Sequence, residues 1–209
     1  MATLIISVLA SIISVVNPLG AMPMFISLTN DYTPREKAKT SLQISFYFTL
    51  ILLSFFLLGT YILSFFGISI NAMRIAGGLV ILSSGYGLLS GEFEKNRSVT
   101  AKVKEEALIK HDISFTPMAM PLLSGPGSIS LLITYYNEYP DWKQRFIIIF
   151  VIILSGILVY LTLRTSSYLN KFLGVAGLKA VSRIMGFLVM SIGVQYIIVG
   201  IVALIDSLR

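Results

Sequence analysis

The sequence predicts an all-α integral membrane protein with six transmembrane helices, arranged as two inverted three-helix repeats in which the first and fourth helices are broken. The 209 residues are 56% hydrophobic and 12% charged, with a mean hydropathy of +0.85, which lies outside the range of soluble globular domains. Six apolar segments are long enough, at about 20 residues each, to cross a bilayer. Pro18 and Pro126, 108 positions apart, interrupt the first and fourth of them.

The breaks follow from the chemistry of proline and glycine. Proline has no backbone N–H and clashes with the preceding turn, so a helix breaks where proline and glycine stand together. The first segment breaks at Asn17 to Gly20 and the fourth at Ser124 to Ser128, whereas the other four are expected to be continuous. The expected spans are Leu4 to Thr29, Ser41 to Phe65, Ala72 to Leu89, Ile113 to Tyr136, Phe146 to Thr165 and Ile184 to Ile205.

A repeat relates the two halves of the chain. Pro18 maps onto Pro126, and Arg74-Ile75-Ala76-Gly77 maps onto Arg183-Ile184-Met185-Gly186, each tetrad at the start of the third span of its half. Because three crossings are an odd number, the second unit must lie upside down relative to the first, as in many secondary transporters. The predicted organisation is a first repeat at residues 1–90, a cytoplasmic linker at 91–111 and a second, inverted repeat at 112–209.

Lys and Arg are distributed unevenly between the connections. With the N-terminus outside, the cytoplasmic connections hold 12 of the 16 Lys and Arg residues. Cytoplasmic loops of membrane proteins carry an excess of these residues, so we expect a multi-pass protein of a prokaryotic plasma or inner membrane with both termini outside. The net charge of +6 then reflects topology, and the scattered basic residues do not indicate a nucleic-acid partner.

Each break leaves backbone groups without helical partners. Following Gly20 and Gly127, a half-helix would begin with free N–H groups and a positive dipole end, and unpaired carbonyls would end the half-helix before each break. Spans that run in opposite directions bring the two breaks together near the midplane. The predicted substrate-binding residues are Asn17, Pro18, Leu19, Gly20, Ser124, Gly125, Pro126, Gly127 and Ser128.

A pocket with paired donors and acceptors suits an α-amino acid. The carboxylate can accept from the free N–H groups, and the ammonium can donate to carbonyls and hydroxyls. No acidic or basic residue stands near either break in the sequence, so a small neutral substrate is expected. The alternative is that the prolines only bend their helices for packing and hold no ligand.

Other residues in the spans have two interpretations each. Arg74 and Arg183 are either symmetric gate residues or anchors to lipid headgroups. Gln43 and Gln195 either line the pathway or bond to a neighbouring helix. Close helix packing is the expected role of four glycines, Gly77, Gly78, Gly87 and Gly91.

Catalysis is not expected. The absence of cysteine excludes thiolate chemistry, and the single histidine, His111, disfavours a histidine metal site or a catalytic triad. We therefore predict no enzyme, no catalytic residue, no metal and no cofactor. His111 and Asp112 could couple transport to protons, or Asp112 could cap the fourth span.

The two broken motifs resemble those of a known family. Asn17-Pro18-Leu19-Gly20, followed by Met22-Pro23-Met24-Phe25, and the stretch from Met120 to Gly127 are similar to the paired signatures of the MarC family of inner-membrane proteins, which includes the archaeal small neutral amino acid transporter SnatA. The resemblance covers essentially the whole chain. It implies uptake of glycine-like and alanine-like amino acids, driven by a gradient of H⁺ or Na⁺, with the substrate at the two discontinuities.

The same resemblance leaves a second function open. The family name derives from an association with multiple antibiotic resistance, which is in keeping with an exporter or pore for small hydrophobic compounds. The expected partners are the substrate, the coupling ion and the lipid bilayer, and a homo-oligomer is left open.

Overall fold

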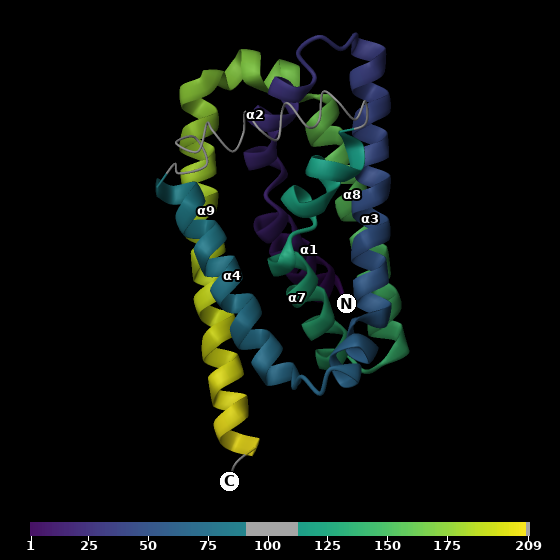
Figure 1. The fold of residues 1–209 in the computed structure, drawn as a ribbon, viewed down its shortest axis with the longest axis vertical. Helices are drawn as coiled ribbons and strands as arrows, with labels where there is room; N and C mark the ends of the chain where they lie inside the picture. The colour runs from purple at the N-terminus through teal and green to yellow at the C-terminus, as the bar shows by residue number, and fades with distance from the viewer. Residues whose placement is uncertain (91–112, 208–209) are drawn as a thin grey trace.

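Helices make up nearly all of the chain that the structure, a computed structural model, describes, which is residues 1–90 and 113–207. No strand occurs in these two ranges. The linker predicted at 91–111, with Gly91, His111 and Asp112, lies outside them. In chain order the elements are α1 (Ala2–Val16), α2 (Pro18–Leu28), α3 (Pro34–Phe65), α4 (Ile70–Ser90), η1 (Ser114–Leu123), α7 (Pro126–Glu138), α8 (Trp142–Arg164) and α9 (Ser166–Ser207), as Figure 1 shows.

Five spans in the described ranges are long and apolar enough to cross a membrane. They are Ala2–Leu28, Pro34–Phe65, Ile70–Ser90, Trp142–Arg164 and Ala176–Asp206. The fourth predicted span is not among them, because η1 and α7 are separate pieces of 10 and 13 residues and neither is long enough alone. The fold is therefore all-helical in the described ranges, and two of its segments are each in two pieces, α1 with α2 and η1 with α7.

Each of the five spans begins earlier than the apolar runs indicate, and for two of them the difference is large. α3 starts at Pro34 rather than Ser41 because Thr33 and Glu36 form a capping box, with the Glu36 N–H donating to Thr33 Oγ1 at 3.3 Å. The last span starts at Ala176 rather than Ile184, after Gly174 turns the chain with a φ of 63°. Basic residues that favour helix continue these spans beyond their apolar stretches, which an argument from hydropathy alone does not detect.

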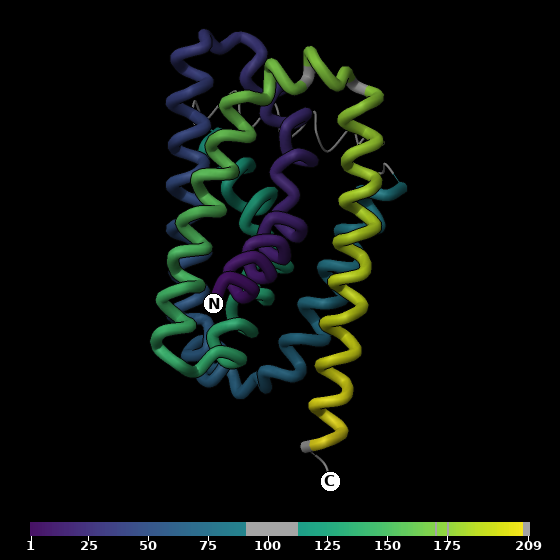
Figure 2. Tube along the Cα trace, turned by 180° about the vertical axis from the view of Figure 1, so that it is seen from behind, coloured from purple at the N-terminus to yellow at the C-terminus, as the bar shows by residue number. Residues whose placement is uncertain are grey.

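Helices from the two halves of the chain pack against each other in pairs. α4 lies along α9 at one side of the molecule and α3 lies along α8 at the other, an arrangement on which Figures 1 and 2 agree. The broken segments, α1 with α2 and η1 with α7, lie between these two pairs. Both breaks therefore lie inside protein, where backbone groups that a helix leaves unpaired need not face lipid.

Glycines allow α4 and α9 to approach closely. A Cβ on Gly78 would stand 2.8 Å from the Gly193 carbonyl oxygen, and one on Gly85 would stand 2.8 Å from the Gly186 carbonyl oxygen. Such distances are too short for any side chain, so the two backbones touch at both levels. Gly78 thus has the packing role that the sequence predicts for it.

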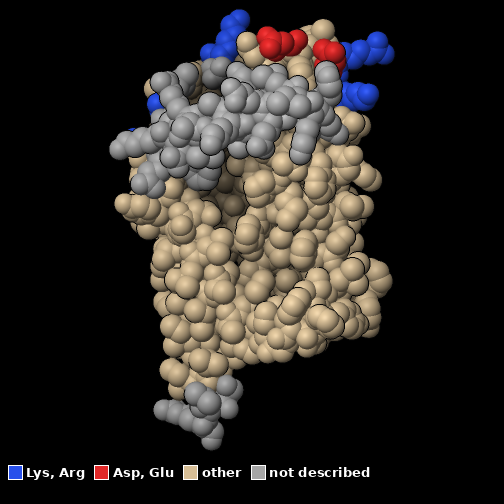
Figure 3. Space-filling view, viewed as in Figure 1, with Lys and Arg blue, Asp and Glu red and all other residues tan. Residues whose placement is uncertain are grey.

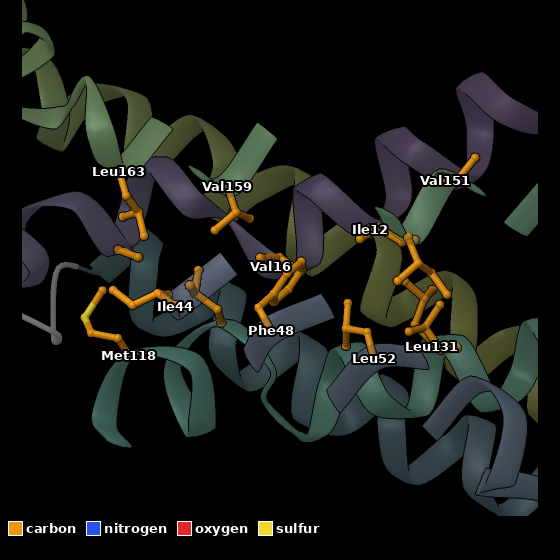
Figure 4. Packing of buried hydrophobic residues seen from close by; sticks show 14 of the residues in the cluster. Ile12, Val16, Ile44, Phe48, Leu52, Met118, Leu131, Val151, Val159 and Leu163 are labelled. Carbon is orange, nitrogen blue, oxygen red and sulfur yellow. The ribbon is translucent and has the colours of Figure 1, made fainter. Parts of the chain in front are cut away.

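The main hydrophobic core lies on the α3–α8 side of the molecule. Figure 4 shows side chains from α1, α3, α7 and α8 packed together, with Ile12 and Phe48 fully buried at its centre. Val16, the last residue of α1, belongs to the same cluster, so the core holds the first helix in place up to its break. α4 and α9 contribute little to this cluster, which leaves them as a separate pair beside a well-packed frame.

Candidate ligand-binding cavity

The first break depends on Asn17, which ends one helix and starts the next. Asn17 has left-handed backbone angles, φ 46° and ψ 64°, and its N–H donates to the Ile13 carbonyl at 2.9 Å. Its side-chain Oδ1 accepts from the Gly20 N–H at 3.1 Å and so caps α2. Asparagine is among the few residues that tolerate the left-handed conformation and also cap helices well. α2 therefore starts at Pro18, and the predicted start following Gly20 is wrong.

The second break is built differently. Ser124 leaves the helical conformation at φ −100° and ψ 57°, and Gly125 caps α7 in an extended conformation without any side-chain hydrogen bond. α7 starts at Pro126, so the predicted start following Gly127 is also wrong. Proline has no N–H to satisfy and fits the first position of a helix, which explains the start at proline in both segments.

The segment before the second break is not a regular α-helix. η1 is a π-helix with non-helical backbone angles at Thr116 and Met120, each of which precedes a proline. A residue before proline is restricted to extended conformations, so Pro117 and Pro121 interrupt the helix twice more. The prediction of two half-helices with one break is therefore wrong for this segment, which has one irregular piece followed by one helix.

The two breaks border one cavity of about 940 Å³. Its walls come from four places, namely the α1–α2 break, α4, the η1–α7 break and α9. The predicted site residues at its surface are Asn17, Gly20, Gly125, Pro126, Gly127 and Ser128, whereas Pro18, Leu19 and Ser124 are not part of its lining. The structure thus brings six of the nine predicted residues into contact with one space.

Two buried polar atoms at the breaks have no hydrogen-bond partner among the described residues. They are Asn17 Nδ2 and Ser124 Oγ, one at each break. Asn17 is only 5% exposed and lines the cavity, so its amide N–H groups can find an acceptor only there. Buried polar groups are nearly always paired in folded proteins, so such an exception requires a specific explanation. An acceptor inside the cavity, from water or a ligand, would satisfy Asn17.

The Ser128 hydroxyl, unlike Asn17 Nδ2 and Ser124 Oγ, has a hydrogen-bond partner. Its hydroxyl donates to the Gly125 carbonyl at 2.9 Å, which closes the first turn of α7. The N–H groups of Gly127 and Ser128 stand at the start of α7, where no earlier residue of the helix can accept from them, and neither has a hydrogen-bond acceptor in the described chain. The site at the second break therefore offers main-chain donors rather than the predicted hydroxyl.

Sequence reasoning missed the charged wall of the cavity. Lys179, Ser182 and Arg183 of α9 line it, which contradicts the expectation of a site without charge near the breaks. The expectation failed because α9 is distant in sequence from both breaks, and because its first turns were expected to form a loop. A signal was present, since residues four apart share one helix face and Arg183 belongs to the repeated tetrad.

Arg74 has a different environment from Arg183. Its side chain is 15% exposed, and its Nη2 lies 3.6 Å from Glu138 Oε2, which links α4 to α7. Between this pair and the cavity, the Ser130 hydroxyl donates to the Met73 carbonyl at 3.1 Å, and a Cβ on Gly77 would overlap Ser130. Arg74 is therefore a partner in a contact between helices rather than a free headgroup anchor, and α4 and α7 are closed against each other there.

The two glutamines within the spans, Gln43 and Gln195, lie outside the cavity. Gln43 Oε1 accepts from the Ser114 hydroxyl at 3.3 Å and is not in the cavity lining, so it bonds to a neighbouring element. Gln195 is exposed on α9 and is also absent from the lining. Gly87 lines the cavity together with the two flanking prolines, Pro23 and Pro121.

Most of the charged side chains on the face in Figure 3 lie at one end of the molecule, which we term the basic end. Figure 3 shows Lys, Arg, Asp and Glu there, above a broad uncharged surface. The described basic residues of this end include Arg35, Lys37, Lys39, Arg164 and Lys171. Lining residues nearest to it, such as Lys179, Ser27 and Ser90, are exposed, so with respect to the described residues the cavity opens toward the basic end.

Comparison with known proteins identifies the family. The model of the MarC family, described as MarC family integral membrane protein, matches residues 2–205. The chain belongs to the MarC family. It is therefore a multi-pass integral membrane protein, in agreement with the spans that the structure contains.

Relatives in the MarC family match along nearly their whole length. A UPF0056 membrane protein of Buchnera aphidicola is 40% identical over 93% of this chain and 90% of its own. A UPF0056 membrane protein of Methanocaldococcus jannaschii is 38% identical over 92% and 93%. The UPF0056 inner membrane protein MarC of Salmonella typhimurium is 32% identical over 95% and 94%. No solved structure matches the chain. These names indicate membrane location, and none includes a substrate.

Proposed function

We propose that this MarC family protein is a secondary transporter of small neutral amino acids such as glycine and alanine, driven by a gradient of H⁺ or Na⁺. One observation carries the proposal. A single cavity borders both helix breaks and contains a buried amide, Asn17 Nδ2, that has no partner among the described residues. Paired discontinuities of this kind are how many secondary transporters hold a substrate in the middle of the membrane.

The chemistry of the cavity suits the two charged groups of an amino acid. A carboxylate can accept from Asn17 Nδ2 and from the N–H groups at the start of α7. An ammonium group can donate to the carbonyls that α1 leaves unpaired at its end, near Val16. The same carbonyls are the available ligands for a coupling cation in the cavity.

Alternating access is the mechanism that this proposal requires. The pairing of α4 with α9 and of α3 with α8 supports two inverted repeats, because each pair joins helices at equivalent positions of the two halves. Movement of the α4–α9 pair against the rest would close the cavity at the basic end and open it at the Arg74–Glu138 pair. We further propose that the basic end is cytoplasmic and that both termini are outside.

Counterflow in proteoliposomes tests the proposal. Vesicles that contain the protein and a high concentration of unlabelled glycine should transiently accumulate labelled glycine from outside, with a rate that saturates. Vesicles without protein, and vesicles with the Gly127→Leu variant, serve as controls. Equal label inside all three preparations would contradict the proposal.

A second candidate function is favoured by the size and walls of the cavity. A volume of about 940 Å³ is close to the upper limit of about 1,000 Å³ for pockets that hold drug-sized molecules, and many of its lining residues are apolar, among them Val15, Ile81 and Leu122. An exporter or pore for small hydrophobic compounds would use this space. Flux of such a compound that rises linearly with concentration, without counterflow of glycine, would favour the pore over the carrier.

A further inference from the structure

Every charged side chain among the described residues that line the cavity is positive. Lys179 and Arg183 carry the charge, and no Asp or Glu stands among the described lining residues. The two cations are four residues apart on α9, so they face the cavity from the same side of the helix. Among the described lining residues, the charge toward the basic end is therefore positive.

Two of the innermost polar groups are donors. Asn17 is 95% buried and presents two amide hydrogens on Nδ2 without an acceptor among the described residues. The 13-residue helix α7 begins at the cavity surface with Gly125, Pro126, Gly127 and Ser128, and no side chain caps it. A helix N-terminus carries a partial positive charge and favours an anion. The buried amide is an independent sign that an acceptor belongs at the same place.

We propose that the cavity recognises its ligand through a carboxylate, and that the ammonium group of an amino acid contributes less to binding. The proposal rests on the transport function given above and extends it, since it assigns the substrate class as small carboxylates. Lys179 and Arg183 attract the anion at the opening, and Asn17 and the start of α7 then hold it. No carboxylate of the described lining is available to pair with an ammonium group.

Three compounds of similar size distinguish binding through the carboxylate from binding through the ammonium group. Glycine has both groups, glycolate has only the carboxylate, and glycinamide has only the ammonium. Binding to the purified full chain in lipid nanodiscs can be measured by thermal stabilisation and by calorimetry. We expect glycine and glycolate to bind with dissociation constants within about tenfold of each other, and glycinamide to bind at least about tenfold more weakly than either, the equivalent of one charge-assisted hydrogen bond.

Variants of α9 test the two cations separately from the fold. Lys179→Gln and Arg183→Gln should each weaken glycolate binding, and the loss should shrink as ionic strength rises. Lys179→Arg and Arg183→Lys keep the charge and should retain most of the affinity. Lys171→Gln, on the same helix but outside the cavity, is the matched control and should bind as the unmodified chain does.

The outcomes distinguish this proposal from the transport function. Glycinamide binding as tightly as glycine, or unchanged glycolate affinity in both Gln variants, would overturn carboxylate recognition. Saturable glycine counterflow in the same preparation would nevertheless leave the transport function standing. Failure of glycine and glycolate to bind, combined with linear flux of a hydrophobic compound, would overturn both.

Discussion

A single side chain, that of Asn17, organises the first break. Its backbone occupies the left-handed region and its Oδ1 caps α2, while its Nδ2 remains without a partner in the described chain. The left-handed conformation costs most residues roughly 1–2 kcal/mol, and glycine is the residue that adopts it freely. Loss of a cap costs about 0.5–2 kcal/mol. Substitutions at this position can therefore separate backbone, cap and ligand effects.

Asn17→Gly, Asn17→Ala and Asn17→Asp should differ in a defined order. Asn17→Ala loses the cap and strains the backbone, so its unfolding midpoint should fall most. Asn17→Gly loses the cap alone and should fall less, whereas Asn17→Asp keeps a capping oxygen and should remain near the unmodified chain. Thermal unfolding of the purified variants measures the order. Asn17→Asp should also lose glycine binding because an acceptor replaces the amide donor, and normal binding by this variant would contradict the assignment.

Gly127 and Gly20 should not tolerate bulk. A Cβ on Gly127 would stand 2.8 Å from Ile81 Cγ1, and a Cβ on Gly20 would overlap the Asn17 side chain that caps α2. Leucine at either position should abolish glycine uptake while the protein still reaches the membrane. Ala10→Leu, at an exposed position of α1, is the control for added bulk.

The Gly127 clash also predicts a rescue. Ile81 Cγ1 belongs to a side chain, so shortening it makes room that a backbone contact could not provide. Gly127→Ala should reduce uptake, and Ile81→Ala in the same chain should restore part of it. No recovery in the double variant would show that the defect at Gly127 has another cause.

At the scale of whole helices, sequence reasoning located the breaks to within two or three residues because proline and glycine act locally. The half-helix starts were missed although the rule that proline favours the first helical position indicates Pro18 and Pro126. The charged wall could not be found in the same way. Lys179 and Arg183 reach the cavity only because α9 packs along α4, and that packing depends on glycine contacts such as Gly85 with Gly186.

The Arg74–Glu138 pair between α4 and α7 should control access from the end opposite the basic end. Glu138 is 47% exposed, so the ion pair stabilises the state in which α4 contacts α7 by no more than about 1 kcal/mol. Its loss can therefore raise the population of the state that is open at this end by at most about fivefold. Ser84 lines the cavity, and the chain has no natural cysteine, so a Ser84→Cys variant reports access directly. In that background Glu138→Gln should raise maleimide labelling from the Arg74–Glu138 side by up to about fivefold.

A matched variant keeps this result specific. Lys143→Gln removes a charge at the same end of the molecule without touching the pair, so it should leave the labelling rate unchanged. Equal labelling rates for the Ser84→Cys protein with and without Glu138→Gln would show that the ion pair does not hold α4 against α7.

At the scale of the whole molecule, the excess of basic residues and the opening of the cavity lie at the same end. The described basic residues concentrate where the cavity opens, and α4 and α7 are in contact toward the other end. Hydropathy and the Lys and Arg count could predict this polarity of the molecule. They could not predict at which end the cavity is open, because that depends on how the α4–α9 pair packs against the other helices.

The orientation in the membrane follows from that polarity and can be measured with single cysteines. Arg35→Cys, at the start of α3, lies at the basic end, and Lys143→Cys, at the start of α8, lies at the other end; both positions are exposed. If the basic end is cytoplasmic, a membrane-impermeant maleimide should label Lys143→Cys in intact cells and Arg35→Cys only after permeabilisation. The reverse pattern would place the cavity opening outside the cell, and the proposed uptake would then start from the conformation seen here rather than end in it.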